Sequence, residues 1–433
     1  MTITEKLQDA LAVLLAVYLV MLQTNLALAL RSVVFGLIVL AALALVLRAD
    51  ARAEAALSPP ARAVVLAFVA WSAWSAASIG WSARPIYSAG ELKTDVIELA
   101  AGCGAMLLCV RRALTFRRFV ATMLGGFAVL ATAAIGMAYA QGGWNDKLIH
   151  HGIGTWSTHI VVIVPLIALV RAPPLAGFGR GSRATAAAVV LFGLALASAR
   201  VSENRMVWPA LIAALAVFAA AGARRWPERW HEHRAIRLAA VVALAALMAA
   251  AFVDVASRKA ESTLAPPPSI GRSVAEDPRL AIWSLVRERI AERPWVGHGY
   301  GKEIVGADLA SRLGDPTLTH AHNAFASVWL QTGAAGLALF LGVLIAAGWR
   351  FAGYLWSPDD ALSLAGAAGL AILAGMIVKN LPDDFFVRTN ARYFWTTLAL
   401  LLAFGERRLR ELARAGVDIA IRGPARGGTT PGA

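Results

Sequence analysis

The sequence predicts an all-α protein that crosses a membrane many times. Three observations support this fold class: a high apolar content, few charges and repeated long apolar runs. Of the 433 residues, 58% are hydrophobic and only 16% are charged, whereas soluble globular proteins average about 45–50% apolar and about 25% charged residues. The apolar content excludes a disordered chain, and two cysteines are too few for a disulfide framework. The net charge of +14 indicates basic loops at the inner face of a membrane rather than a nucleic-acid partner.

Twelve apolar runs approach the roughly 20 residues that a helix needs to cross the hydrocarbon core. They lie near residues 7–22, 26–47, 63–79, 95–110, 119–140, 156–170, 184–199, 206–222, 238–255, 324–349, 362–378 and 392–404. We therefore expect about twelve transmembrane helices in one membrane domain. The parts of this domain are spans one to nine within 1–255, a long loop at 256–323, spans ten to twelve within 324–404, and a tail at 405–433.

Basic residues predict the orientation of these spans. If the N-terminus lies inside, the inner loops and the tail carry 23 Lys and Arg residues, against nine in the short outer pieces. The positive-inside rule then places both termini in the cytoplasm and the long loop outside. The first apolar run is interpreted as an uncleaved span, because Glu5, Lys6 and Asp9 do not form the basic segment of a signal peptide.

The long loop contains a predicted amphipathic helix at 278–292, lying along the membrane surface. Apolar residues recur with a period close to 3.6 between Leu280 and Ile290. Asp277 followed by Pro278 is typical of a helix start. Three prolines, 266–268, end any helix that continues from the preceding span.

Polar residues where this loop re-enters the membrane form a candidate site, since composition does not explain them. His320, His322 and Asn323 stand directly before span ten. Two histidines at this spacing could also ligate a metal, and the pair Asp383-Asp384 in the last outer loop keeps a divalent-metal alternative open. No cysteine and no convincing carboxylate neighbour support such a site, so we expect no metal.

A second polar segment, Ser202 to Arg205, forms the short outer turn between spans seven and eight. For Arg200, just before it, the simpler interpretation is snorkelling to headgroup phosphates. Arg205 is the candidate functional residue of this turn.

Four short motifs follow one another along the second half of the chain. They are Asn204 to Trp208 (NRMVW), Arg279-x-x-x-Trp283, Pro294 to Gly301 (PWVGHGYG), and His322-Asn323 with Gly333 and Gly336 beyond. In this order they resemble the O-antigen ligase and polymerase family of bacterial envelope enzymes. The twelve-span layout, with one long outer loop before span ten, is similar to that of the ligase branch. The motifs cover roughly residues 185–400, and the resemblance elsewhere is one of layout.

The resemblance implies a bacterial inner-membrane enzyme with its active site facing the periplasm. It would transfer an O-antigen glycan from undecaprenyl diphosphate to a sugar hydroxyl of lipid A–core, without a cofactor or metal. Arg205 and Arg279 would bind the diphosphate, because a guanidinium stays charged and grips phosphate oxygens through two donors. His322 would deprotonate the attacking hydroxyl, giving inversion in one displacement, and Asn323 would bind or orient nearby groups.

Two other interpretations stay open. A polymerase that joins lipid-linked repeat units would use the same donor chemistry, and the acceptor that separates the two is not visible in the sequence. A lipid or glycan transporter is less favoured, because transporters place ionisable groups near mid-membrane, where these runs are almost free of charge. The roles of three further arginines also stay open between solvated charge and acceptor binding: Arg287, Arg289 and Arg293.

Overall fold

The computed structural model describes residues 2–24, 27–48, 56–110, 112–144, 152–171, 182–225, 234–263, 278–316 and 318–416. Within these ranges every regular element is a helix. The α-helices are α1 (Ile3–Met21), α2 (Leu28–Val46), α4 (Pro59–Ala77), α5 (Pro85–Leu92), α6 (Glu98–Cys109), α7 (Ala113–Gln141), α8 (Gly152–Ile167), α9 (Ser182–Val201), α10 (Val207–Arg225), α12 (Arg234–Thr263), α14 (Pro278–Glu292), α15 (Gly306–Leu313), α16 (Ala324–Leu355), α17 (Asp360–Lys379) and α18 (Arg388–Arg414).

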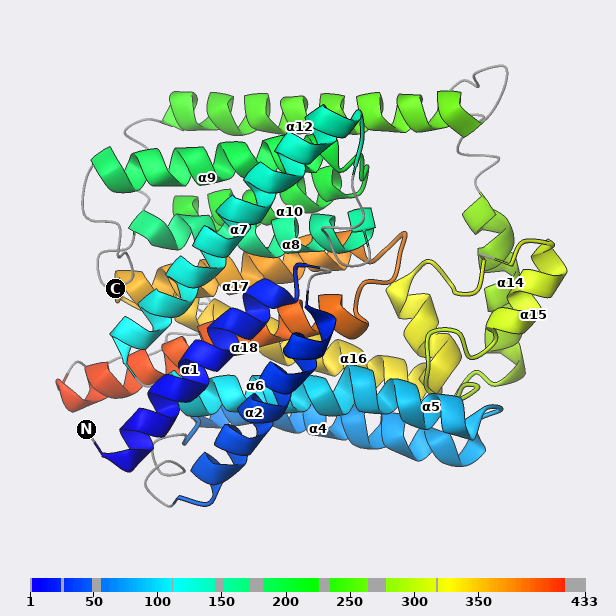
Figure 1. Ribbon diagram of the computed structural model, residues 1–433, viewed down its shortest axis with the longest axis horizontal. Coiled ribbons are helices and arrows are strands. Elements are labelled where there is room, and N and C mark those ends of the chain that lie inside the picture. The colour runs from blue at the N-terminus through cyan, green and yellow to red at the C-terminus, as the bar shows by residue number, and fades with distance from the viewer. Residues whose placement is uncertain are drawn as a thin grey trace, which may run out of the picture.

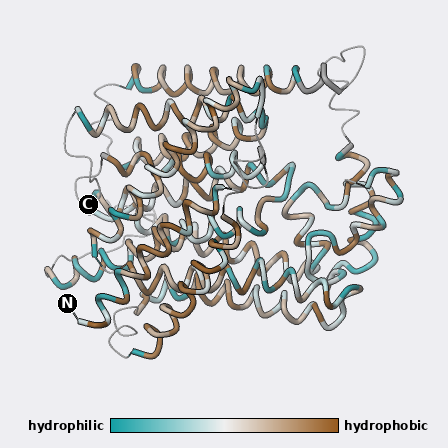
Figure 2. The backbone as a smooth tube through the Cα atoms, viewed as in Figure 1, coloured by the Kyte–Doolittle hydropathy of each residue, from teal (hydrophilic) through white to brown (hydrophobic). Residues whose placement is uncertain are grey.

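The long helices run side by side as a bundle, with a small helical cap at one end (Figure 1). The start of α1 and the end of α18 lie at the left-hand end of the view, and α14 and α15 form the cap at the right-hand end. Hydrophilic residues gather at the helix ends and in the cap, while the bundle is mostly hydrophobic (Figure 2). This distribution is the one expected for a bundle that spans a membrane.

Each of the twelve predicted runs falls on a helix, but these twelve helices differ in length and composition. Among the described residues, eight helices are long and apolar enough to cross a membrane: α2, α4, α7, α9, α10, α12, α16 and α17. The other four runs fall on α1, α6, α8 and α18. Helix α6 is shortened by the π-helical turn Lys93–Ile97, and α8 spans only 16 residues before a 3-10 turn. Length and composition thus support eight membrane spans, and the number of twelve spans remains a prediction.

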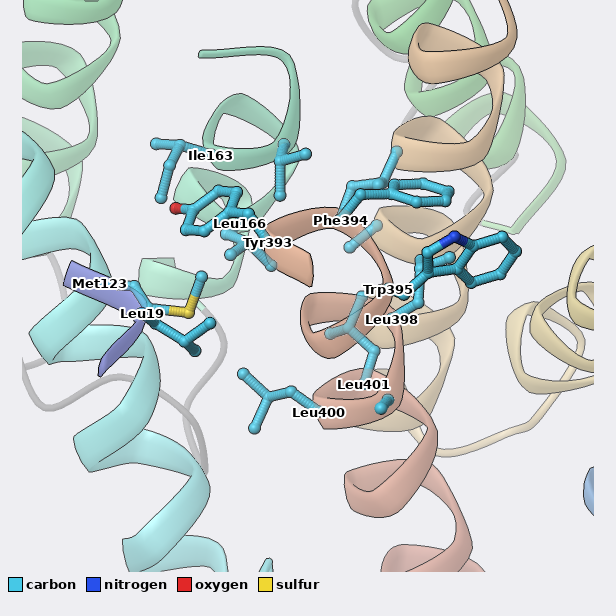
Figure 3. Packing of buried hydrophobic residues seen from close by; sticks show 14 of the residues in the cluster. Leu19, Met123, Ile163, Leu166, Tyr393, Phe394, Trp395, Leu398, Leu400 and Leu401 are labelled. Atoms are coloured by element: carbon cyan, nitrogen blue, oxygen red, sulfur yellow. The ribbon is translucent and has the colours of Figure 1, made fainter. Parts of the chain in front are cut away.

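Helix α18 lies in the middle of the bundle, which explains its weak sequence signal. Its residues from Tyr393 to Arg407 are all buried. Side chains of α1, α7 and α8, among them Leu19, Met123 and Ile163, surround it (Figure 3). A helix covered by protein need not present apolar side chains to lipid, so charged residues at both of its ends are tolerated. Residues 405–414, expected in the tail, continue this helix; residues 417–433 of that predicted tail lie outside the described residues.

A buried ion pair joins three helices at the end of the bundle opposite the cap. Arg350 Nε of α16 donates to Glu406 Oε1 of α18 at 2.8 Å, and the hydroxyl of Tyr354 donates to the same oxygen at 2.7 Å. The second carboxylate oxygen accepts from the backbone N–H of Ser58, at the start of α4, at 2.8 Å. Because each charge is paired and hydrogen-bonded, the pair can be buried without an uncompensated charge.

Helix α14 has the predicted bounds, but its buried face is narrower than the sequence suggests. Ile282 and Val286 are buried against α15 and α16, whereas Leu280 is 47% exposed and Trp283 is 36% exposed. The apolar stripe is therefore covered by protein, so the expectation that it rests on a membrane surface is not needed to explain it. The predicted start signal at Asp277 and the prolines at 266–268 lie outside the described residues.

Candidate active site

A break in α16 receives the glycine-rich loop that links α14 to α15. Gly333 has φ 71° and ψ −177° in the middle of the helix. Its Cβ position would collide with the backbone of Trp295, so only glycine allows the two chains to approach this closely. Across the break, the N–H of His298 donates to Leu330 O and the N–H of Gly299 to Gln331 O, each at 2.9 Å. The glycines of the sequence motif are thus explained by backbone packing.

Two tryptophan side chains, Trp81 and Trp329, hold the same loop against the bundle, and a third, Trp74, binds α16 beside the break. Trp74 Nε1 donates to Thr332 O at 2.8 Å, Trp81 Nε1 to Val296 O at 3.0 Å, and Trp329 Nε1 to Pro294 O at 2.9 Å. The contacts join α4, the loop and α16. The outer half of α16 is therefore a rigid support for the residues at its start.

Helix α16 begins with the predicted His-Asn pair. Asn323 is its N-cap, and the carboxamide oxygen accepts from the N–H groups of Phe325 and Ala326 at 3.0 and 2.9 Å. His322, immediately before the cap, has φ 45°, a left-handed conformation that is uncommon outside glycine and typical of functional or strained positions. Trp283 of α14 donates to the carbonyl of Ala321 at 3.0 Å. Helix α14 therefore also holds the segment that carries His320 and His322.

The loop between α17 and α18 is attached to the same point. The N–H of Ala324 donates to the carbonyls of Asn380 and Asp383, at 3.0 and 2.9 Å. Asn380 stabilises its own loop by accepting from the N–H of Phe385 at 2.6 Å. The N–H of Asp384 donates to Asp383 Oδ1 at 2.8 Å. These bonds fix the Asp383 carboxylate beside the histidines.

His320, His322 and Asp383 form one cluster. Asp383 Oδ1 lies 3.5 Å from His322 Nδ1 and 3.9 Å from His320 Nε2, and the two imidazole rings lie with centroids 3.8 Å apart. His322 Nδ1 is buried, and its contact with Asp383 is longer than a well-formed hydrogen bond. The side chain of His322 is 20% exposed, so part of it can be reached from outside the protein.

The cluster shifts the pKa values of its members in definite directions. Burial alone would raise the pKa of the Asp383 carboxyl, but the two histidines and the N–H of Asp384 hold it well below its usual range. Burial lowers the pKa of His320, and the positive charge of Lys302 lowers it further, against the opposing effect of Asp383. Asp383 therefore carries a negative charge at neutral pH, next to a neutral His320.

The same three residues are the candidate metal ligands among the described residues. One ligand atom from each lies within 4.8 Å of the others. Two imidazoles and one carboxylate suit Zn²⁺ or another transition metal. The geometry thus supplies the carboxylate neighbour that the sequence did not reveal, and both a metal site and a histidine–carboxylate base are chemically possible here.

The two predicted diphosphate ligands lie at the same end of the bundle, on other elements (Figure 1). Arg205 is half-buried in the turn between α9 and α10, and Arg279 is half-buried in the first turn of α14. Within the described parts of the chain, no hydrogen bond or ion pair joins either arginine to His322. The structure thus brings His322, Asn323 and Asp383 together, and leaves the two arginines on neighbouring elements.

Two lysines near the cluster did not stand out in the sequence. Lys379, fully buried at the end of α17, donates to Ser157 Oγ at 2.6 Å and lies 4.0 Å above the ring of Phe385. Lys302 donates to the carbonyl of Asp384 at 3.2 Å. In the sequence, only the position of Lys379 at the outer end of an otherwise apolar run could have indicated that this lysine lies near the site. Both lysines hold the loop that carries Asp383.

An apolar cavity of about 280 Å³ lies deeper in the bundle, between α4, α6, α16 and α18. Its lining includes Phe68, Cys103, Gly104, Phe351 and Trp395, and it is almost entirely carbon. An aromatic column of Trp395, Phe386 and Phe325 runs from the cavity to the loops of the cluster, with ring centroids 6.4 Å apart at each step. A space of this size and lining is suited to a hydrocarbon chain.

Comparison with known families gives a match over about two fifths of the chain. Residues 167–341 match the model of a family described as O-antigen ligase. The matched segment runs from the end of α8 into α16 and contains Arg205, Arg279 and His322, whereas Asp383 lies beyond it. No curated protein matches the chain.

Proposed function

We propose, from the match of residues 167–341 to a family described as O-antigen ligase, that this chain is a membrane glycosyltransferase of lipopolysaccharide biosynthesis. The proposed donor is an O-antigen glycan on undecaprenyl diphosphate, and the proposed acceptor is a sugar hydroxyl of lipid A–core. The observation that carries the proposal is the pairing of His322 with Asp383 at the mouth of α16, inside the end of the bundle that bears the cap.

The proposed reaction is a single inverting displacement. The acceptor oxygen forms a bond to the anomeric carbon while the bond from that carbon to the diphosphate breaks. His322 takes the hydroxyl proton on Nε2, and Asp383 faces Nδ1, where it orients the ring and stabilises the imidazolium that forms. The leaving undecaprenyl diphosphate carries away the electron pair.

Arg205 and Arg279 are proposed to bind the diphosphate. Their positions at the cap end of the bundle support this role, because a lipid diphosphate would sit at that membrane surface. Two guanidinium groups would also neutralise the charge that develops as the leaving group departs. Asn323 is proposed to contribute to substrate binding beside His322. Its carboxamide oxygen is already used as the N-cap of α16.

The proposed topology is a twelve-span inner-membrane protein with both termini in the cytoplasm and the cap in the periplasm. Basic side chains support it, because Arg48 and Arg112 bind Thr4 and Asp9 near the start of α1, and Arg224 and Arg225 stand in the last turn of α10. The apolar cavity is proposed to take part of the polyprenyl chain of the donor.

The transfer is proposed to need no metal. The Asp383 carboxylate and the backbone contacts around it already orient His322, and undecaprenyl diphosphate is an activated leaving group. The alternative, a metal held by His320, His322 and Asp383, would occupy the nitrogen lone pairs that the base requires.

The test is a transfer assay in a strain that lacks its own ligase, comparing wild type with His322→Ala at equal membrane expression. We expect wild type to restore a ladder of long glycan on lipid A–core, and His322→Ala to lose it by a factor of about 10²–10⁴. Arg312→Gln is a control, because this exposed side chain of α15 pairs with Glu288 and belongs neither to the histidine cluster nor to the cap pocket. Normal transfer by His322→Ala would overturn the mechanism.

A polymerase is the second candidate, because the donor chemistry is the same. In the same assay, a polymerase would leave lipid A–core bare and lengthen the glycan on its lipid carrier. A transporter would do neither.

A further inference from the structure

A second pocket, of about 460 Å³, lies in the cap, between α14, α15 and the segment before α5. Its polar lining is formed by Arg84, Arg289, Arg293, Glu292, His298 and Asp308. None of these residues takes part in the proposed glycan transfer. The pocket nevertheless belongs to the same rigid unit as the histidine cluster, since α14 also holds the loop of His322 through Trp283.

The two carboxylates of the pocket are both engaged by one arginine. Arg289 Nε donates to Asp308 Oδ2 at 2.9 Å, and Nη1 donates to the two carboxylate oxygens of Glu292 at 2.7 and 3.0 Å. These bonds raise the pKa of Arg289, so it stays charged throughout. Asp308 and Glu292 are thus turned toward Arg289, and this part of the pocket has a net charge of −1; Arg84 and Arg293 bring the lining as a whole to +1.

Arg84 and Arg293 are placed differently. Within the described residues, each guanidinium makes one hydrogen bond, and its acceptor is a backbone carbonyl: Glu303 O at 3.4 Å for Arg84 and Trp81 O at 3.2 Å for Arg293. Arg84 is also held 4.5 Å above the ring of Tyr87. An arginine has five N–H donors, so both side chains are positioned by the protein and retain donors for a ligand.

The floor of the pocket is rigid. His298 is only 8% exposed, its ring nitrogen Nε2 lies 2.8 Å from Arg289 O, and its backbone N–H donates to α16. A pocket with a fixed floor and two oriented guanidinium groups has the features of an anion site, because guanidinium binds phosphate oxygens in a bidentate fashion.

We propose that this pocket binds a phosphate group on a sugar of the acceptor glycolipid, through Arg84 and Arg293. The inference rests on the proposed function and extends it by naming an acceptor subsite. A sugar phosphate is favoured over a phospholipid headgroup because most of the pocket lining comes from α14, α15 and the loop between them; α14 and α15 form the cap in Figure 1, where hydrophilic residues gather (Figure 2). A phosphate held there would orient the acceptor toward His322.

The test measures acceptor binding directly, with the full chain in nanodiscs of zwitterionic lipid. The probes are lipid A–core with its core-sugar phosphates and the same glycolipid without them. We expect wild type to bind the phosphorylated form about tenfold more tightly, as expected for one or two charge-assisted hydrogen bonds. The double variant Arg84→Gln/Arg293→Gln is expected to bind both forms equally, at the wild-type affinity for the form without phosphate.

The matched control is Arg287→Gln, an exposed arginine of α14 outside the pocket, which is expected to keep the tenfold preference. Equal binding of both forms by wild type would overturn the proposal, and so would a preference that survives in the double variant. Equal binding of both forms by wild type, together with an enrichment of anionic lipid around wild type that the double variant loses, would assign the pocket to a lipid headgroup instead. Because binding is read without transfer, a failed transfer assay with an intact preference would reject the proposed function and leave this subsite standing.

Discussion

His322 Nδ1 lies 3.5 Å from Asp383 Oδ1, although α16 and α17 separate the two residues along the chain. The contact exists because the first N–H of α16, that of Ala324, donates to the carbonyls of Asn380 and Asp383. The loop before α18 is therefore attached to the start of α16, and His322 and Asp383 are held by the same backbone junction.

Asp383→Asn is expected to lower the transfer rate about 10²-fold while leaving the amount of folded protein unchanged, because the amide cannot stabilise the imidazolium form of His322. The measurement is initial rate at equal membrane expression. Asp254→Asn is the control, since that carboxylate pairs with Arg200 on another part of the cap end. Equal losses in both variants would contradict a specific role for Asp383.

Acid is expected to destabilise the protein through His320. Its pKa is lowered in the folded protein, mainly by burial, so the folded state binds fewer protons than the unfolded state. The contribution of neutral His320 to the free energy of unfolding is complete above the pKa of an unfolded histidine, about 6.5. This contribution is lost as pH falls through the lower pKa that His320 has in the folded protein. The melting temperature in detergent should therefore drop below pH of about 6.5, and His320→Gln should reduce the drop. Asp383 contributes a separate loss at lower pH, because its pKa is also lowered. Parallel pH curves for wild type and variant would show that His320 is not responsible.

Gly333→Ala is expected to destabilise the fold by about 1–3 kcal/mol. The residue has φ 71°, and a Cβ there would meet the backbone of Trp295. Gly342→Ala, in the same helix, is the matched control, because nothing lies within 4 Å of its Cβ position; it should be neutral or slightly stabilising. Thermal unfolding of both variants checks the prediction, and similar melting temperatures would refute it.

Gly104→Leu is expected to raise the KM for the polyprenyl donor about tenfold by filling the apolar cavity with a side chain. No atom lies within 4 Å of the Cβ position of Gly104, so the leucine can enter the cavity without displacing a neighbour. Gly36→Leu on α2 is the control, since it has equal space and does not line the cavity. If the two variants change KM equally, the cavity does not hold the donor.

Chelation is expected to leave transfer within about twofold of its initial rate, because His322 already has an orienting carboxylate and a general base needs no metal. The measurement is the rate of purified protein after EDTA treatment, with and without added Zn²⁺ or Mn²⁺. Added Zn²⁺ should inhibit by binding the cluster of His320, His322 and Asp383. Loss of activity on chelation, restored by the metal, would instead make the cluster a metal centre.

The sequence by itself determined the helical class, the approximate positions of twelve helices and the bounds of α14, because apolar runs are local properties; α5 and α15 were not predicted. It also suggested His322 as a candidate, since a polar residue at the edge of an apolar run is visible without a fold. It underestimated α18, because a helix buried by protein does not need the composition of one exposed to lipid.

Only the tertiary structure decided which groups meet. The partner of His322 comes from a loop two helices away, the break at Gly333 is explained by the chain that enters it, and the pocket of Arg84 and Arg293 combines residues from two distant segments. Composition and periodicity describe neighbours along the chain, whereas these contacts depend on how helices of fixed length pack. That packing is set by side-chain shape and by backbone hydrogen bonds between segments far apart in sequence.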